Sequence, residues 1–477
     1  MKEEKFSNEF KSMFREYDIR GKTNDEQLND ESVYLIISAY AEYLSARNIS
    51  RVVVGYDNRK CSPSFAHACI KALLEHGKEV YYVGLAITPM VYYAQYLYKC
   101  EGAVMITASH NPDGWSGFKM AKGYSKTLEP ADIREVLAFV EKAKEPAPEA
   151  FKGKLHTVNA RDAYVDEIAS RIKMGPHKPR LVIDAGNGAA GLIAYEVFFK
   201  LGCLTFHLNC DPDDNYPHYF PNPSDLAARE RLREMVLHPY IKADLGLGFD
   251  GDGDRLGVID EQGQDIYSDI ILAVLAKQLL EKKPGSTIIY DVKCSQTLED
   301  VIRQNAGNPI MWMTGHSYIK AKLHEEKAEL AGERSGHIFF AGDDYYGFDD
   351  AVFTAAKLVE YVSHSEQTMS EVVDLLPLYV TSPEIKAHCD DTEKYKISEQ
   401  LIEDFKKAYP GKVFDLNGAR VSFEHGWGLV RPSSNLPEFV IIFEADTLRH
   451  LLEIRQVFKN VLSKYPEISQ TWENDPY

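Results

Sequence analysis

The chain has 477 residues, of which 44% are hydrophobic and 26% are charged, a composition typical of a folded globular protein. This length is too great for one hydrophobic core and favours about three domains. The formal net charge of −18 argues against nucleic acid or an anionic membrane as a partner, because both bind clustered Lys and Arg.

The sequence gives no sign of export or membrane insertion. Residues 1–11 lack the apolar segment of a signal peptide, and the longest conspicuous apolar run, 270–276, falls short of the ~18 residues that span a bilayer. The seven cysteines are scattered without a C-x-x-C pair, which argues against a disulfide framework and a zinc site. We expect a cytoplasmic protein.

The first 140 residues alternate strand and helix patterns. Segments 51–56, 79–83 and 103–107 are typical of buried strands. Between the first two, 63–76 carries apolar residues at helical spacing after a proline and a serine that suit a helix start. Alternating strands and helices predict crossover units and a largely parallel sheet.

A break in this pattern falls at 144–150 (KEPAPEA), where we place the first domain boundary. The α/β pattern resumes in three further segments: 181–185, 244–249 and 287–292. It changes again near 375–383, and shorter strand patterns follow: 413–416, 419–423 and 438–444. An amphipathic helix is predicted over 447–465, with Asp446 as its N-cap. We expect three α/β units and one smaller α+β unit.

The segment TASHNP at 107–112 follows a predicted strand. Ser109 therefore lies on a strand-end loop, where α/β proteins place their chemistry. An ordinary turn is an equally good interpretation in isolation, since Ser, Asn and Pro all form turns. The G-x-S-x-G spacing of a hydrolase is absent.

Three aspartates alternate with glycine in the segment DGDGDR at 250–255. Asp250, Asp252 and Asp254 would repel one another unless a cation held them together, and oxygen ligands favour a hard ion such as Mg²⁺. An EF-hand loop is the main alternative, with Glu261 at its twelfth position. It fails at the sixth position, where Arg255 replaces glycine, and LGVID after it is typical of a strand. The segment predicts a metal site.

Two further polar loops carry groups that suit a sugar phosphate. GERSGH at 332–337 offers Glu, Ser and His side chains for hydroxyl groups. RPSSN at 431–435 joins an arginine to two hydroxyls and an amide, a reasonable phosphate cradle. Taken alone, either segment could equally be a solvated loop or turn.

Taken together, the order and spacing of these four segments resemble the α-D-phosphohexomutase superfamily, especially its bacterial phosphomannomutase/phosphoglucomutase branch. The resemblance covers nearly the whole chain and includes six further motifs: FREYDIRG at 14–21, GFK at 117–119, DAGNG at 184–188, DVKC at 291–294, TGHS at 314–317 and YGFDD at 346–350.

The resemblance implies an α/β fold: three similar α/β domains with mixed sheets plus a C-terminal α+β domain around a central cleft. The implied domains are 1–150 with the phosphoserine loop, 151–256 with the metal loop, 257–376 with the sugar loop and 377–477 with the phosphate loop. A monomer is more consistent with it than an oligomer.

The resemblance also implies an isomerase that interconverts hexose 1-phosphate and hexose 6-phosphate, of mannose, glucose or both. The reaction would pass through a phosphoserine and a hexose 1,6-bisphosphate, which also serves as activator, with Mg²⁺ as cofactor. The implied catalytic residues are Ser109, Lys119, Arg20, His110 and His337. The implied substrate-binding residues are Tyr17, Lys293, His316, Glu333, Ser335, Arg431, Ser433, Ser434 and Asn435. The implied metal ligands are Asp250, Asp252, Asp254 and Ser109.

This chain departs from the family pattern at two places. Ser434 and Asn435 stand where the family usually has Asn or Gly followed by Thr, and Arg334 stands where it usually has Met, Glu or Gln. The choice between mannose and glucose is therefore open. Lys119 ranks first as general base, provided that burial or nearby cations lower its pKa.

Three other functions remain as alternatives. A phosphoglucosamine mutase would use the same fold and serine, and Arg334 argues weakly against it. A phosphatase would hydrolyse the phosphoserine, and a sugar-phosphate sensor would not turn it over. An intact Ser109 and an intact aspartate triad favour the mutase.

Overall fold

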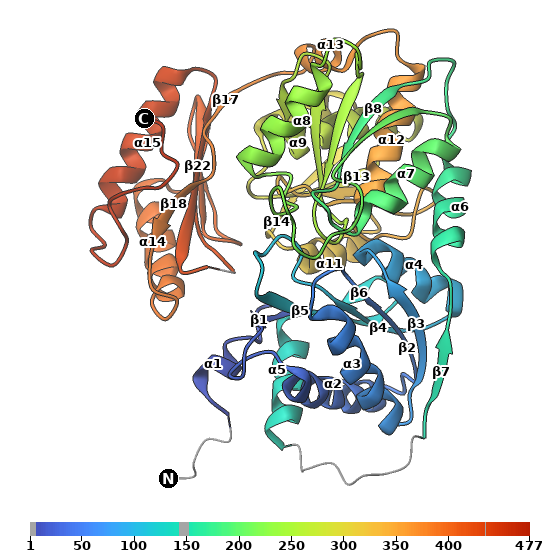
Figure 1. The fold of residues 1–477 in the computed structure, drawn as a ribbon. Helices are drawn as coiled ribbons and strands as arrows, with labels where there is room; N and C mark the ends of the chain where they lie inside the picture. The colour runs from blue at the N-terminus through green and yellow to red at the C-terminus, as the bar shows by residue number, and fades with distance from the viewer. Residues whose placement is uncertain (1–5, 143–151, 435) are drawn as a thin grey trace.

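The computed structural model describes residues 6–142, 152–434 and 436–477. Within them the strands form four sheets, each packed with helices (Figure 1). We call these sheets with their helices the first to fourth domains, in chain order. The predicted domain break at 144–150 and the predicted phosphate ligand Asn435 lie outside the described residues.

The first sheet has seven strands in the order β1-β5-β4-β2-β3-β7, with β6 beside β5. Its strands are β1 (Ile19–Lys22), β2 (Arg51–Tyr56), β3 (Glu79–Leu85), β4 (Gly102–Ile106), β5 (Trp115–Gly123), β6 (Lys126–Thr127) and β7 (Lys154–Thr157). β2, β3, β4 and β7 are parallel, but β5 runs antiparallel to β4 and β1. The sheet is mixed, as the resemblance implied.

The helices of the first domain are α1 (Asn8–Lys11), α2 (Asp30–Ser45), α3 (Ser62–Glu75), α4 (Thr88–Tyr98) and α5 (Pro130–Lys142). The predicted helix at 63–76 corresponds to α3, which begins with a proline in its first turn. The expectation that 79–83 is a buried strand was wrong in part, because most of β3 is only half-buried. Its neighbour β7 is the edge strand of the sheet.

The second and third domains repeat a smaller version of this arrangement. The second has sheet order β12-β11-β10-β8-β9 and the third β14-β13-β15-β16. The second-domain elements are α6 (Arg161–Arg171), β8 (Arg180–Asp184), α7 (Ala190–Lys200), β9 (Leu204–Leu208), α8 (Leu226–Val236), β10 (Leu245–Phe249), β11 (Leu256–Asp260) and β12 (Asp265–Ile266). The third-domain elements are α9 (Ser268–Lys282), β13 (Thr287–Asp291), α10 (Gln296–Gln304), β14 (Asn308–Trp312), α11 (His316–Glu326), β15 (Leu330–Gly332), β16 (Ile338–Phe340), α12 (Ala351–His364) and α13 (Met369–Asp374).

Two of the sheets include strands that lie beyond the predicted domain boundaries. β7 follows residue 150 but pairs with β3 of the first sheet. β11 and β12 lie at or beyond residue 256, yet β11 pairs with β10 of the second sheet. β11 also shows that the aspartate loop leads into a strand, unlike the exiting helix of an EF-hand.

The fourth domain stands apart at the left of Figure 1 and is joined to the third through β17. Its elements are β17 (Val380–Thr381), β18 (Ile385–His388), α14 (Lys394–Ala408), β19 (Val413–Phe414), β20 (Ala419–Ser422), β21 (Gly426–Pro432), β22 (Glu438–Ala445) and α15 (Leu448–Leu462). All its strand pairs are antiparallel. The predicted N-cap of α15 was wrong: Thr447 caps the helix by accepting from the His450 amide, while Asp446 contacts the imidazoles of His425 and His450.

The four predicted functional loops occupy equivalent positions in the four domains. Each connects two neighbouring antiparallel strands: β4 to β5, β10 to β11, β15 to β16, and β21 to β22. In the first three domains the leading strand belongs to the parallel part of the sheet. The carboxyl end of a parallel strand is where α/β sheets bind ligands.

One hydrophobic cluster spans the first three domains, from β2 through α7 and α9 to α12, and each of these domains also has a cluster of its own. The fourth domain has a core of its own around Phe405, Phe443 and Phe458. A small apolar cluster joins Val292 of the third domain to Trp427 of the fourth. Apolar burial is the dominant stabilising term, so the fourth domain is the one least tied to the rest.

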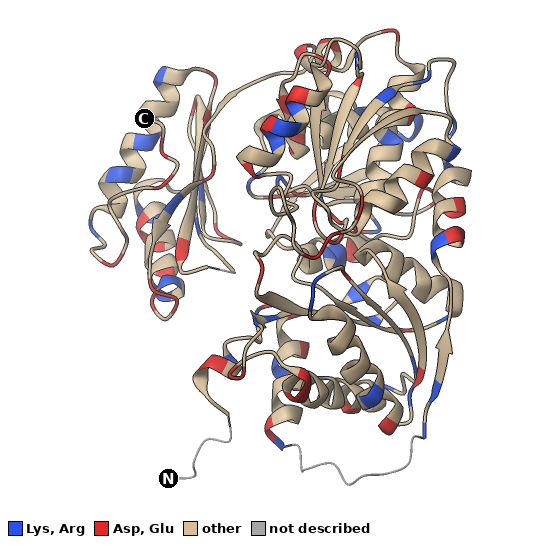
Figure 2. Ribbon diagram, viewed as in Figure 1, with Lys and Arg blue, Asp and Glu red and all other residues tan. Residues whose placement is uncertain are grey.

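Charged residues of both signs lie mainly on the outer helices and loops, while the sheets are largely uncharged (Figure 2). Among the described residues, no helix is both long enough and apolar enough to cross a bilayer. All seven cysteines are free thiols.

Candidate active site

Loops from all four domains line one cleft of about 1020 Å³. The cleft gathers most of the predicted site residues: Tyr17, Arg20, Ser109, His110, Lys119, Lys293, His316, Glu333, Ser335, His337, Arg431, Ser433 and Ser434. The three aspartates of the predicted metal site are fully buried beside it.

Ser109 lies on the loop after β4 and adopts a left-handed backbone conformation, with φ of 50°. This conformation is uncommon for a residue other than glycine; here the Ser109 amide donates to Thr107 Oγ1 at 2.8 Å. The Ser109 hydroxyl donates to Asp250 Oδ2 at 2.7 Å and lies 3.2 Å from His110 Nδ1. The loop thus delivers a serine hydroxyl of the first domain to a carboxylate of the second.

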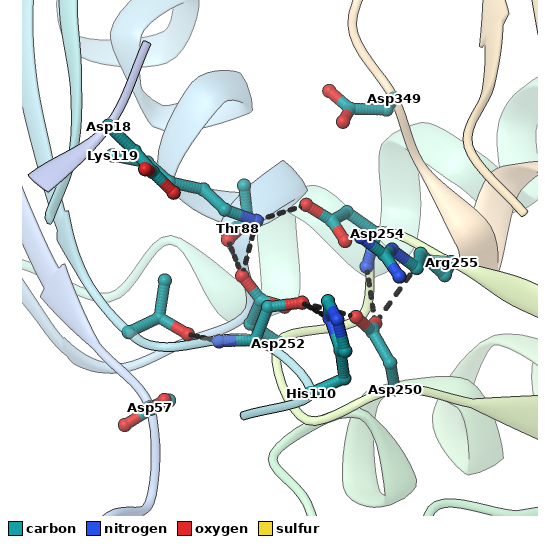
Figure 3. Close-up of polar contacts among 12 residues, drawn as sticks. Asp18, Asp57, Thr88, His110, Lys119, Asp250, Asp252, Asp254, Arg255 and Asp349 are labelled. Carbon is teal, nitrogen blue, oxygen red and sulfur yellow. Dashed lines mark hydrogen bonds and ion pairs between the residues drawn. The ribbon is translucent and has the colours of Figure 1, made fainter. Parts of the chain in front are cut away.

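Asp250, Asp252 and Asp254 converge in the loop after β10, with ligand oxygens all within 4.8 Å of one another (Figure 3). Lys119 points between two of them: its ammonium donates to Asp252 Oδ2 at 2.7 Å and also contacts Asp254 Oδ2. Thr88 Oγ1 donates to Asp252 at 2.6 Å. The lysine neutralises only part of the triad's charge.

The triad fits a hard cation. Within the described chain, the Oδ1 atoms of Asp252 and Asp254 are buried and have no hydrogen-bond partner. Buried carboxylates without partners are costly unless a charge compensates them. Three buried oxygen donors suit Mg²⁺ or a similar ion.

Burial and mutual repulsion set the ionisation of these groups. Burial, followed by repulsion from Asp254 and Asp252, raises the pKa of Asp250 well above its usual range. Burial also acts to raise the pKa of Asp252, but Lys119 outweighs it and the net shift is downward. Burial opposes the charge on Lys119, yet Asp252 and Asp254 raise its pKa well above normal. The lowered pKa on which a Lys119 base depends is therefore absent from this structure.

His337 lies between charged neighbours of both signs. Arg255 Nε donates to His337 Nε2 at 2.9 Å, so this nitrogen acts as an acceptor. On the other side, His337 Nδ1 lies 2.9 Å from Asp349 Oδ2, and Asp349 Oδ1 accepts from Lys320 at 3.0 Å. Nε2 is therefore an unprotonated nitrogen whose lone pair Arg255 engages, and a carboxylate lies beside Nδ1.

The two other histidines of the cleft are uncharged. Burial lowers the pKa of His110 well below its usual value, and Arg255 and Arg20 add to the shift. Burial likewise lowers the pKa of His316. Both ring nitrogens of His316 lack hydrogen-bond partners within the described residues, although the ring lines the cleft and packs against Tyr17 with centroids 4.9 Å apart. His316 therefore has both nitrogens available for a ligand.

The sugar loop after β15 is held by its own hydrogen bonds. Glu333 accepts from the Gly315 amide at 2.5 Å and from Ser335 Oγ at 2.9 Å. Arg334, whose unusual identity left the sugar preference open, has its guanidinium engaged elsewhere. It lies 3.4 Å from Asp269 Oδ2 and donates to Thr381 Oγ1 at 3.1 Å.

The phosphate loop between β21 and β22 presents Arg431, Ser433 and Ser434 to the cleft. Arg431 Nη2 donates to Ser434 Oγ at 3.4 Å. Lys293 reaches the same region from the third domain but is ion-paired with Glu384 of the fourth at 2.8 Å. Attraction to Lys293 outweighs burial and lowers the pKa of Glu384 to about 2.

Arg20 bridges the amino-terminal motif and the serine loop. Its guanidinium donates to Asp18 Oδ2 at 2.6 Å and to Asn111 Oδ1 at 2.7 Å. Burial disfavours its charge, but Asp18 outweighs burial and raises the pKa of Arg20. The arginine is a permanent cation at the edge of the serine loop.

Arg59 was not identified from the sequence, although its guanidinium hydrogen-bonds the backbone of the serine loop. Its guanidinium donates to the carbonyl oxygens of Ser109 at 2.8 Å and of Asn111 at 2.6 Å, and to those of Pro112 and Trp115. Arg59 Nε in turn donates to Asp57 Oδ2 at 3.1 Å, which helps to hold the guanidinium in place. The polar run DNR directly after strand 51–56 was an available signal, because it occupies the same strand-end position as the serine. Asp349 lies in the YGFDD motif at 346–350, but no role was assigned to it, and Thr88 carried no signal of its role.

Comparison with known proteins agrees with this geometry. Three matched families are described as phosphoglucomutase/phosphomannomutase, alpha/beta/alpha domain I over residues 11–147, domain II over 162–263 and domain III over 267–379. A phosphomannomutase/phosphoglucomutase of Pseudomonas syringae pv. tomato is 38% identical over 95% of each chain. The chain belongs to the phosphoglucomutase/phosphomannomutase family. It is accordingly an enzyme, a hexose-phosphate mutase.

Other members of the family are similar to this chain over nearly their full length. A phosphoglucomutase of Neisseria gonorrhoeae is 36% identical, covering 96% of this chain and 98% of its own. The crystal structure of a phosphoglucomutase/phosphomannomutase family protein from Burkholderia thailandensis superposes with a TM-score of 0.87 at 35% identity, covering 96% of this chain and 98% of that one. The predicted fold is thereby confirmed, including its fourth domain.

Proposed function

We propose that the chain interconverts hexose 1-phosphate and hexose 6-phosphate, with glucose and mannose phosphates as substrates, through a phosphoserine at Ser109. The contact between the Ser109 hydroxyl and Asp250 carries the proposal. It joins a nucleophile to a buried cation-binding triad at a cleft that sugar-binding and phosphate-binding loops also line. Phosphoryl transfer requires this combination of positioning and charge neutralisation.

Asp250, Asp252 and Asp254 would hold the Mg²⁺ ion, with an oxygen of the phosphorylated Ser109 as a further ligand. Bound there, the ion supplies charge neutralisation for the phosphoryl oxygens. Lys119 already contacts two of these carboxylates and carries a positive charge. It is placed to stabilise the same phosphoryl group.

The phosphate that is not transferred would bind Arg431, Ser433 and Ser434, while Glu333 and Ser335 hold the sugar hydroxyls. The free sugar hydroxyl then faces the phosphoserine. Its oxygen bonds to phosphorus, the bond from phosphorus to Ser109 Oγ breaks, and a hexose 1,6-bisphosphate forms. The bisphosphate turns around, and the serine takes back the other phosphate.

In the first transfer one proton leaves the attacking sugar hydroxyl and one is delivered to Ser109 Oγ. In the second transfer Ser109 Oγ is the attacking group and loses its proton, and the sugar oxygen that leaves phosphorus gains one. His337 would serve as the base once substrate displaces Arg255 from Nε2, since that nitrogen is unprotonated and Asp349 Oδ2 lies 2.9 Å from Nδ1. His110 lies 3.2 Å from Ser109 Oγ and is uncharged, so it is placed to exchange a proton with the serine. Lys119 and Arg20 act as cationic donors.

Phosphorus NMR tests the proposal directly. Purified protein with Mg²⁺ and a trace of glucose 1,6-bisphosphate should convert glucose 1-phosphate or mannose 1-phosphate to the 6-phosphate. The ratio of the two rates measures the sugar preference. Release of inorganic phosphate without isomerised product would show a phosphatase instead. Conversion of glucosamine phosphate alone would show a phosphoglucosamine mutase.

A further inference from the structure

Glu16 occupies the junction of the first, third and fourth domains. It lies in the segment between α1 and β1, next to Tyr17 of the cleft. Its Oε1 accepts from Tyr395 Oη at 3.0 Å, and its Oε2 accepts from Tyr318 Oη at 3.2 Å and from Ser434 Oγ at 3.1 Å. Three hydroxyl donors from two other domains thus converge on one carboxylate.

One of these donors belongs to the phosphate loop. A serine hydroxyl has a single proton to donate, and Ser434 gives it to Glu16 while accepting from Arg431. A phosphate seated beside Arg431 would need the same proton. Glu16 and the phosphate therefore compete for Ser434.

We propose that Glu16 is a built-in competitor of the substrate phosphate, placed to keep its binding to the Arg431 loop weak enough to reverse. The inference rests on the proposed function, in which one phosphate must leave this loop before the bisphosphate can turn around. The carboxylate acts in two ways: it takes the Ser434 proton when the loop is empty, and its negative charge repels a phosphate that sits there.

The surroundings keep the carboxylate in this position. Burial, followed by the charge of Glu16, raises the pKa of Tyr318 and of Tyr395, so both phenols stay protonated donors. The neighbouring residue Arg15 lies 4.0 Å from Asp391 of the fourth domain. When a phosphate takes Ser434, the two tyrosines still hold Glu16 close to the loop, so the repulsion persists in the complex.

Calorimetric titration of glucose 6-phosphate tests the inference without turnover. The protein carries Ser109→Ala, which leaves the phosphate loop unchanged, with and without Glu16→Gln. The glutamine keeps an acceptor oxygen for the hydroxyls but removes the charge. We expect Glu16→Gln to bind about threefold to tenfold more tightly, and the gain to shrink when NaCl is raised to about 0.5 M.

Glu9→Gln is the matched control, because Glu9 is an exposed residue of α1 and the change in net charge is the same. Its affinity should equal that of the parent. With Ser109 restored, Glu16→Gln should lower KM without raising kcat, a split that loss of structure would not produce.

Unchanged or weaker binding by Glu16→Gln would overturn the inference, and so would a gain that Glu9→Gln shares. Failure of the parent protein to bind glucose 6-phosphate at all would overturn the phosphate-loop assignment, and the inference with it. The two failures are distinguishable because the second is seen before Glu16 is changed.

Discussion

At the scale of single residues, the metal triad shows a conflict between stability and function. Asp250, Asp252 and Asp254 are fully buried, and two of their oxygens have no hydrogen-bond partner among the described residues. Groups of like charge held together in the dry interior destabilise the fold. Such strain at a functional site is the usual cost of activity.

Replacing Asp250 by Asn should separate the two effects. Mutase activity should fall at least about 100-fold, since a ligand and the acceptor of the Ser109 hydroxyl are both altered. In EDTA, however, the free energy of unfolding should rise by about 1–3 kcal/mol, because asparagine removes the buried carboxyl group whose ionisation burial and the other two aspartates oppose. Thermal denaturation of the wild type and of Asp250→Asn, both in EDTA, measures this difference in stability. A less stable variant would contradict the account of the triad.

Sequence reasoning could find residues whose pattern has few structural explanations. Aspartate alternating with glycine is poor strand and poor helix material, so the triad could be recognised from the sequence. Arg59 acts by donating to backbone carbonyls, and Asp349 acts through His337. Such roles depend on contacts between distant segments, and residue type alone does not reveal them.

At the scale of elements, the four functional loops share one design: each joins antiparallel neighbours at the edge of the cleft. The strands before the serine and aspartate loops were predicted within a residue or two, because neither contains a polar side chain. The antiparallel pairing was not predicted from periodicity. Partner strands are chosen by tertiary packing, which a single segment does not encode.

Replacing Arg59 should affect kcat more than KM, because its guanidinium hydrogen-bonds the backbone of the loop that carries Ser109. Arg59→Ala removes the donors to the carbonyls of Ser109 and Asn111. We expect kcat to fall about 10- to 100-fold with KM within about threefold, since the phosphate and sugar loops are untouched. Circular dichroism should show an unchanged fold. A raised KM with normal kcat would argue against a role in positioning Ser109.

Helix α12 carries a pH-dependent cap. Asp350 is its N-cap and accepts from Tyr164, Tyr345 and the Phe353 amide. Burial outweighs these bonds and raises its pKa to about 6. Between its usual pKa of 3.8 and about 6, the unfolded chain releases the proton while the folded chain keeps it. Raising the pH through this range should therefore lower stability, by at most about 3 kcal/mol.

Asp350→Asn provides the check, because asparagine caps helices equally well and does not titrate. The fall in unfolding free energy between about pH 4 and pH 6 should be smaller in the variant than in the wild type. Some pH dependence should remain, since burial also raises the pKa of Asp184 to about 6. Urea denaturation at a series of pH values measures this fall. If the unfolding free energy changes equally with pH in the two proteins, this role for Asp350 is ruled out.

At the scale of the whole molecule, the fourth domain is held differently from the other three. Its contact with the third domain combines one small apolar cluster with polar contacts: Arg420 donates to the carbonyls of Val292 and Cys294, and Lys293 pairs with Glu384. Polar interfaces between domains permit relative motion more readily than large apolar ones. A separate unit near 377–477 was predicted from its shorter strand patterns, but its contacts with the cleft required the folded structure.

We therefore predict that bisphosphate binding slows hydrogen exchange in the fourth domain. The ligand would bridge its phosphate loop to the serine loop and so restrain motion of this domain relative to the other three. Exchange in β21, β22 and β17 should slow measurably on addition of glucose 1,6-bisphosphate, while the shared core of the first three domains changes little. Exchange rates that do not respond to the ligand would contradict a mobile fourth domain.

The most direct test of the central claim is the mass of the enzyme itself. After incubation with Mg²⁺ and glucose 1,6-bisphosphate, the wild type should gain the mass of one phosphoryl group on the peptide that contains Ser109. Adding glucose 6-phosphate should remove it and regenerate the bisphosphate, and Ser109→Ala should gain nothing while losing at least about 100-fold in conversion. A Ser109→Ala protein that still interconverts the hexose phosphates at a comparable rate would contradict the phosphoserine mechanism.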